Sequence, residues 1–145
     1  MRRLIVAALV LGLAVGCGGG QRSHNVRDVE RVFHDAGVPF RTETVPNPYL
    51  QGNQLVLPGK LRGDPIEQHV QAVLGRSNTE HFTIAIAWVF DSDGHARDAV
   101  AAVPLRRWLV STHATIRERA GNVIVVGTGT PGEMVRLARA LADLR

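Results

Sequence analysis

The nine residues from Phe82 to Phe90 constrain the fold most, because they read Phe-Thr-Ile-Ala-Ile-Ala-Trp-Val-Phe. Large apolar side chains alternate with smaller ones, which is the period of a β-strand. A strand that is apolar on both faces belongs in the middle of a sheet, where both faces are covered. The segment therefore predicts a central strand with one side packed by helices and a tighter opposite side.

Four segments have the apolar spacing of amphipathic helices. Residues that cap helix N-termini precede them, namely Asn25, Asp64, either Asp91 or Ser92, and Thr130. Glycine or proline follows the first three, at Gly37, Gly75 and Pro104. The predicted helices cover residues 26–36, 64–74, 92–103 and 130–144.

Shorter segments between these helices have the composition of strands and are bounded by turn residues. They cover residues 40–45, 55–57, 105–111, 113–119 and 122–126. Ala120-Gly121-Asn122 predicts a tight turn that joins the last two strands in a hairpin. Hairpins with intervening helices predict an α+β fold: a two-layer sandwich in which a mostly antiparallel sheet carries helices on one face.

The N-terminus has a different character. Arg2 and Arg3 precede an apolar run from residue 4 to 13, and small residues lead up to Cys17. This arrangement is typical of a secretory signal. The apolar run is shorter than the roughly 20 residues of a membrane span. The glycine-rich segment 18–23 predicts a flexible tether.

Leu13-Ala14-Val15-Gly16-Cys17 resembles the lipobox of bacterial lipoproteins, with Ala14 where many lipoboxes carry leucine. The resemblance implies cleavage after Gly16 and attachment of diacylglycerol to the thiol of Cys17. The expected location is the extracytoplasmic face of the cell membrane, held by the lipid anchor. We therefore expect a signal peptide over 1–16, a lipidated tether over 17–24 and one domain over 25–145. A secretory signal with an incidental cysteine, or an uncleaved anchor, is the alternative.

The domain also resembles small, uncharacterised lipoproteins of actinobacteria. The resemblance rests on an apolar strand ending in Val-Phe, a small-residue helix, Gly-Asn-Val-Ile-Val-Val and a terminal Ala-Leu-x-x-Leu helix. These motifs are structural, so the resemblance implies no activity.

Size and charge exclude several classes of function. The signal accounts for two of the 17 basic residues, which leaves a mature chain of 129 residues with 15 basic and 13 acidic side chains. A net charge of +2 does not indicate a nucleic-acid partner, which requires a concentrated basic face. Because Cys17 is the single cysteine, no internal disulfide or cysteine-based metal site can form.

The segment from Gly127 to Gly132 fits the G-x-G-x-x-G pattern of dinucleotide-binding loops. Pro131 removes one N–H donor, and only 13 residues follow Gly132, so the rest of such a fold cannot follow. The pattern therefore predicts a strand-to-helix turn. A small anion bound at Gly127, Gly129 and Thr130 is the alternative that we keep.

No metal or catalytic site is predicted. The histidines lack the close spacing of metal ligands, and they stand at His24, His34, His69, His81, His95 and His113. Asp91-Ser92-Asp93-Gly94 is similar to the start of a calcium loop, but Ala102 stands where the loop needs its glutamate. We interpret this segment as a helix cap and Trp108 as a packing residue.

Three hypotheses for function follow. We expect a non-enzymatic lipoprotein that needs no cofactor and binds an envelope protein partner. The alternative is a small-molecule or ion-binding lipoprotein with a pocket between sheet and helices. The third is a small hydrolase, which would require polar side chains that converge in one cleft.

Overall fold

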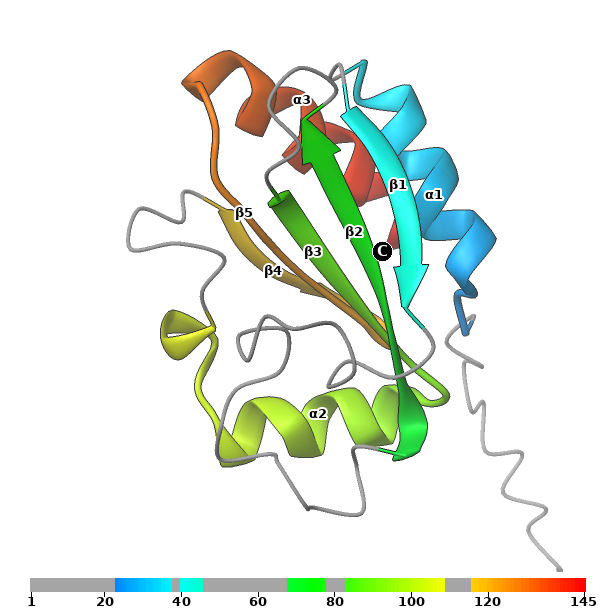
Figure 1. Ribbon diagram of the computed structural model, residues 1–145. Coiled ribbons are helices and arrows are strands. Elements are labelled where there is room, and N and C mark those ends of the chain that lie inside the picture. Colours follow the sequence, from blue (N-terminus) through cyan, green and yellow to red (C-terminus); the bar gives the residue numbers. More distant parts are fainter. Residues whose placement is uncertain (1–22, 38–39, 46–67, 78–82, 109–115) are drawn as a thin grey trace, which may run out of the picture.

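The computed structural model describes residues 23–37, 40–45, 68–77, 83–108 and 116–145 (Figure 1). Its five strands form one sheet in the order β1-β2-β3-β5-β4, and every neighbouring pair is antiparallel. The strands are β1 (Phe40–Val45), β2 (Val70–Ser77), β3 (Thr83–Phe90), β4 (Ile116–Ala120) and β5 (Val123–Gly127). The helices are α1 (Val26–Asp35), α2 (Asp93–Ala102) and α3 (Pro131–Leu141), with short 3-10 turns η3 (Leu105–Arg107) and η4 (Ala142–Leu144). The predicted α+β class with an antiparallel sheet is confirmed.

The apolar segment that constrained the fold is the central strand β3. Trp88 of β3 pairs with Ala72 of β2 on one side and with Ile124 of β5 on the other. The predicted hairpin joins β4 to β5, and Gly121 in its turn has a φ of +55°. Glycine adopts this left-handed conformation without the steric cost that a Cβ atom brings.

Two apolar cores lie on opposite faces of the sheet. α1 and α3 cover one face, where Phe33 and Leu137 are fully buried with the smaller side chains of β3. Trp88 and Phe90 point to the other face. The predicted alternation fails at Ile84, which joins the α1 and α3 side. The pairing of β2 with β3 shifts there, and an extra residue in one strand reverses the direction of the next side chain.

The sequence predicts helices on one face of the sheet, but the structure has α2 on the face opposite to α1 and α3. The small residues Ala96 and Ala99 of α2 are fully buried against the Trp88 face. The helix crosses below the strands in Figure 1. Val103 and Trp108 complete this core, and Trp108 lies edge-on to Trp88 with ring centroids 4.8 Å apart. Trp108 is a packing residue, as predicted, and its indole N–H donates to the carbonyl of Val103.

One predicted helix is wrong. The spacing of apolar residues up to Leu74 predicts a helix over 64–74, but Val70–Ser77 forms β2. Short apolar runs fit either period, and here the pairing with β3 decides, because Ala72 and Leu74 alternate with Val73 across the sheet. The helix-start residues Asp64-Pro65-Ile66-Glu67 lie outside the described residues.

The strand expected over 105–111 is also corrected. Leu105–Arg107 forms a 3-10 turn, in which Arg107 N–H donates to the carbonyl of Pro104. The expected strand over 55–57 and residues 109–111 lie outside the described residues. The strand expected over 113–119 is β4, which begins at Ile116.

The caps predicted for the three helices that form are confirmed. Asn25 forms a capping box with Asp28, and Thr130 forms one with Glu133. Ser92, rather than Asp91, caps α2, because its hydroxyl accepts the N–H of His95. Gly37 follows α1 with a φ of +59°. Within the described ranges, no helix has the length and apolar character needed to cross a membrane.

Candidate functional site

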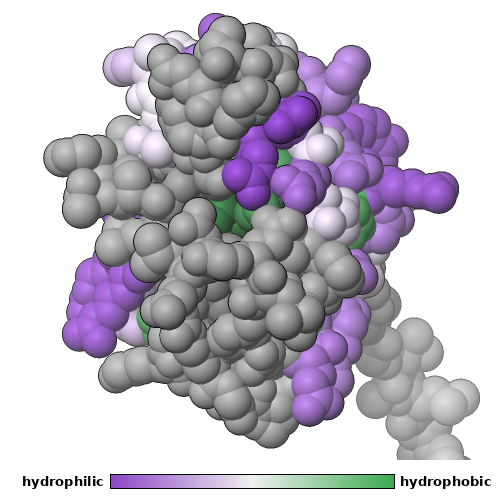
Figure 2. Space-filling view, viewed as in Figure 1, coloured by the Kyte–Doolittle hydropathy of each residue, from purple (hydrophilic) through white to green (hydrophobic). Residues whose placement is uncertain are grey.

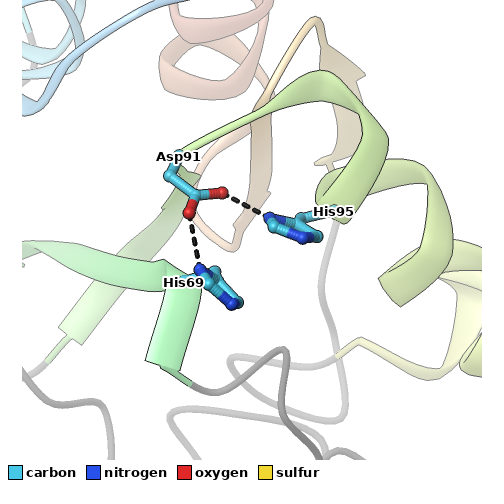
Figure 3. A group of neighbouring side chains, drawn as sticks. All are labelled: His69, Asp91 and His95. Atoms are coloured by element: carbon cyan, nitrogen blue, oxygen red, sulfur yellow. Dashed lines mark hydrogen bonds and ion pairs between the residues drawn. The ribbon is translucent and has the colours of Figure 1, made fainter.

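His69, Asp91 and His95 are brought together at one end of the sheet (Figure 3). Val70, the first residue of β2, pairs with Phe90, the last residue of β3. The residues just beyond that pair are His69 and Asp91, and the N–H of Asp91 donates to the carbonyl of His69 at 2.9 Å. His95 stands four residues after Asp91, in the first turn of α2. The pairing of β2 with β3 and the start of α2 therefore fix the backbone positions of all three residues.

The carboxylate of Asp91 lies between the two imidazole rings. Its Oδ2 is 2.6 Å from Nδ1 of His69, and its Oδ1 contacts Nδ1 of His95. The two rings stack with centroids 4.2 Å apart and an angle of 23° between their planes. In Figure 3 both Nδ1 atoms face the carboxylate, one from the start of β2 and one from α2.

The electrostatics assign the roles of donor and acceptor. Partial burial raises the pKa of Asp91, but hydrogen bonds from His95 and His69, and the charges of both, outweigh it and hold the pKa below its usual value. An ionised carboxylate can only accept hydrogen bonds. Both Nδ1 atoms therefore carry hydrogen in this arrangement, and Asp91 orients both rings.

These three side chains have the composition of a transition-metal site. Each residue offers one ligand atom, and the three atoms lie within 4.8 Å of one another. Imidazole ligands suit zinc, copper, iron and nickel, and zinc also accepts a carboxylate oxygen. Neighbouring ligands of a tetrahedral zinc ion are about 3.3 Å apart, given bonds of about 2.0–2.1 Å. The side chains of His69, Asp91 and His95 are 39 %, 50 % and 37 % exposed, so they have room to rotate inward.

An open groove adjoins the site. It has a volume of about 710 Å³ and runs from the start of α1 to the start of β2 and the end of β3. Its lining includes Ser23, His24 and Arg27 as well as His69 and Asp91. A ligand in this groove would reach the two site residues that flank the β2 and β3 pair.

The sequence interpretation missed this site for two reasons. The incorrect helix over 64–74 put His69 on a different element, away from the end of β3. The remaining signal, Asp91 and His95 four residues apart at a helix start, is also produced by ordinary capping. Only the antiparallel pairing of β2 with β3 joins His69 to that pair.

The other histidines have different surroundings. The imidazole of His24 contacts the carbonyl of Leu144 at 2.7 Å. His34 is exposed, and its Nδ1 lies 3.2 Å from the carboxylate of its neighbour Asp35. His81 and His113 lie outside the described residues.

The residues kept for anion binding lie at the other end of β5. Gly127 is the buried last residue of that strand, and Gly129 and Thr130 are exposed. The carboxylate of Glu133 accepts the backbone N–H of Thr130 at 2.8 Å. A Cβ atom on Gly129 would lie 2.9 Å from that carboxylate. An anion at this helix start would compete with a carboxylate that already occupies it.

Asp93 of the calcium-like segment forms ion pairs with Arg97 and Arg119. The negative charge of Asp93 is compensated by two arginines and by the N-terminus of α2, which agrees with the interpretation of a helix cap. Gly16 and Cys17, the predicted cleavage and lipidation residues, lie outside the described residues.

Comparison with known proteins gave no match: no family model, no curated protein and no solved structure is similar to this chain at a significant level. The inference of function therefore rests on the residues and geometry of the chain itself.

Proposed function

We propose that the protein is a lipid-anchored extracytoplasmic protein whose domain binds a divalent transition-metal ion through His69, Asp91 and His95. The observation that carries the proposal is the convergence of these three side chains, with ligand atoms within 4.8 Å of one another. The sequence analysis also considered an ion-binding lipoprotein, but with a pocket between sheet and helices, whereas these residues lie at the surface where β2 begins and β3 ends.

The exposure of the site supports a role in binding rather than catalysis. The site lies on the surface, with side chains more than one third exposed. Catalytic metal sites work in shaped cavities that exclude water. An open site of this kind suits an ion that is captured and released.

The surface gives less support to an apolar docking site for an envelope protein. Among the described residues, Val135 is the one large hydrophobic residue that is exposed, at 56 %. On the face shown in Figure 2, the described residues at the surface are mostly hydrophilic, and the hydrophobic colour is confined to small recessed areas. An envelope partner that meets these residues would meet polar side chains.

The metal site is tested by isothermal titration calorimetry, in which zinc is titrated into the mature domain. We expect one zinc ion per chain. We expect the double variant His69→Gln/His95→Gln to lose at least tenfold in affinity, since loss of even an outer-shell partner costs about 10–100-fold. His34→Gln is the matched control, because it removes a histidine that also contacts an aspartate. Equal affinity in all three proteins would refute the site.

The anchor is tested separately. Mass spectrometry of the mature N-terminus should show a diacylglyceryl group on Cys17, and Cys17→Ser should move the protein out of the membrane fraction. Two or more acyl chains hold a protein stably in a bilayer, because each buried methylene contributes about 0.8 kcal/mol. An unmodified Cys17 in the native protein would refute the anchor.

A further inference from the structure

The point where the predicted tether joins the domain is held firmly. The N–H of His24 donates to Oδ1 of Asn122 at 2.7 Å, and the side-chain amide of Asn122 donates back to the carbonyl of His24 at 2.8 Å. Asn122 is 1 % exposed, and these partners are 98 residues apart in sequence. The chain therefore leaves the domain from a fixed position.

The same asparagine connects the tether to the metal site. Its side chain also donates to the carbonyl of Phe90, and the backbone carbonyl of Asn122 accepts the N–H of Phe90 at 2.9 Å. The residue after Phe90 is Asp91, the centre of the site. A continuous set of hydrogen bonds and peptide bonds thus joins the tether to Asp91.

The surface shows the same proximity. Ser23 and His24, where the tether ends, line the same groove as His69 and Asp91. In Figure 1 the first residues of α1, the start of β2 and the start of α2 lie at one end of the sheet, at the lower right. Gly127 and the start of α3 lie toward the opposite end, where Thr128 N–H donates to the carbonyl of Ile84.

The tether is too short to allow the opposite orientation. Six residues lead from Cys17 to Ser23, and they reach at most about 22 Å at 3.3–3.6 Å per residue. A domain of this size has a radius of gyration of about 14 Å, so its diameter is roughly 35 Å. The tether would have to extend along the whole domain to turn the α3 start toward the bilayer.

We propose that the end of the domain that carries His69, Asp91 and His95 faces the lipid headgroups, so that the site exchanges its metal ion at the membrane surface. This inference rests on the proposed lipid anchor and metal site, and it names the surface at which that site works. Arg27, which is exposed and lines the groove, brings a positive charge to this surface, where anionic headgroup phosphates would attract it.

The orientation is tested by energy transfer in vesicles of phosphatidylcholine and phosphatidylglycerol that contain an acceptor-labelled headgroup lipid. The lipidated mature protein carries one fluorophore, either on Gln71→Cys beside the groove or on Gly132→Cys at the start of α3. Both positions are exposed, and the acylated thiol of Cys17 does not react. We expect clearly stronger transfer from position 71.

Insertion of twelve glycine and serine residues after Gly20 is the matched control. It should reduce the difference between the two positions, because the longer tether allows the domain to turn. Equal transfer from both positions with the native tether, or stronger transfer from position 132, would overturn the orientation.

Zinc binding is measured on the same labelled proteins, which separates the two proposals. Zinc binding that depends on His69 and His95, together with equal transfer, overturns the orientation and leaves the metal site standing. Absence of zinc binding overturns the proposed function, whatever the transfer shows. Absence of transfer from both positions overturns the anchor and, with it, this inference.

Discussion

The side chain of Asn122 forms hydrogen bonds with both the N–H and the C=O of His24, and so joins two parts of the chain that are 98 residues apart. We expect Asn122→Ala to lower the free energy of unfolding by about 2 kcal/mol, because it leaves buried backbone groups without partners. Urea denaturation measures this change. Asn25→Ala removes an exposed cap and should cost about 1 kcal/mol. If Asn122→Ala lowers the free energy of unfolding no more than Asn25→Ala does, the hydrogen bonds of the buried amide do not stabilise the domain as we describe.

Two glycines should respond to the same substitution with opposite signs. Gly37 has a φ of +59°, and a Cβ atom added there would have no atom within 4 Å. Gly37→Ala should therefore destabilise the protein only through the left-handed backbone conformation, by about 1–2 kcal/mol. Gly94 lies in α2, and an added Cβ would meet Ser92 Oγ at 3.7 Å, an ordinary contact. We expect Gly94→Ala to stabilise the protein by about 0.4–1 kcal/mol, because alanine reduces the conformational entropy of the unfolded chain. Denaturation midpoints of the two variants that shift in the same direction would contradict this.

Glu133 should make stability depend on pH. The backbone N–H and then the hydroxyl of Thr130 hold the pKa of its carboxyl below the ordinary value of 4.5. A lowered folded pKa means that the contribution is fully present above pH 4.5 and is lost as the pH falls through the folded pKa. Glu133→Gln should therefore lower Tm at pH 7, and the two Tm curves should converge below pH 4.5. If the difference in Tm between the two proteins stays the same below pH 4.5, the charge of Glu133 does not contribute to stability.

Asp91→Asn can separate the contribution of Asp91 to zinc affinity from its contribution to the stability of the fold. Asp91→Asn keeps the shape of the side chain and removes its charge, so zinc affinity should fall by at least about tenfold. Its side chain is 50 % exposed, so the loss of its ion pairs should lower the free energy of unfolding by no more than about 1 kcal/mol. Asp35→Asn, which alters the other aspartate beside a histidine, is the control and should leave zinc affinity unchanged. A large loss of stability in Asp91→Asn would make the residue structural.

The sequence predicts the parts of this fold that depend on local chemistry. The alternation around Trp88, the cap at Asn25 and the turn at Gly121 each follow from side-chain size, hydrogen bonding or backbone freedom within a few residues. The structure has all three. Where local chemistry is ambiguous, as in the apolar run up to Leu74, the pairing with β3 decides the outcome.

The candidate site depends on that same pairing, which explains why the sequence does not reveal it. Asp91 and His95 are four residues apart, but His69 comes from 22 residues earlier in the chain. Its approach requires β2 to be a strand in a particular register with β3. A pattern that leaves strand and helix open at residues 70–74 cannot specify that register.

The most direct test of the central claim is X-ray diffraction from crystals of the mature domain grown with zinc, with data collected on both sides of the zinc absorption edge. We expect an anomalous peak about 2.0–2.1 Å from one ring nitrogen of His69 and one of His95. A structure with both rings still hydrogen-bonded to Asp91 and no peak beside them, or with zinc bound only at other histidines, would contradict it.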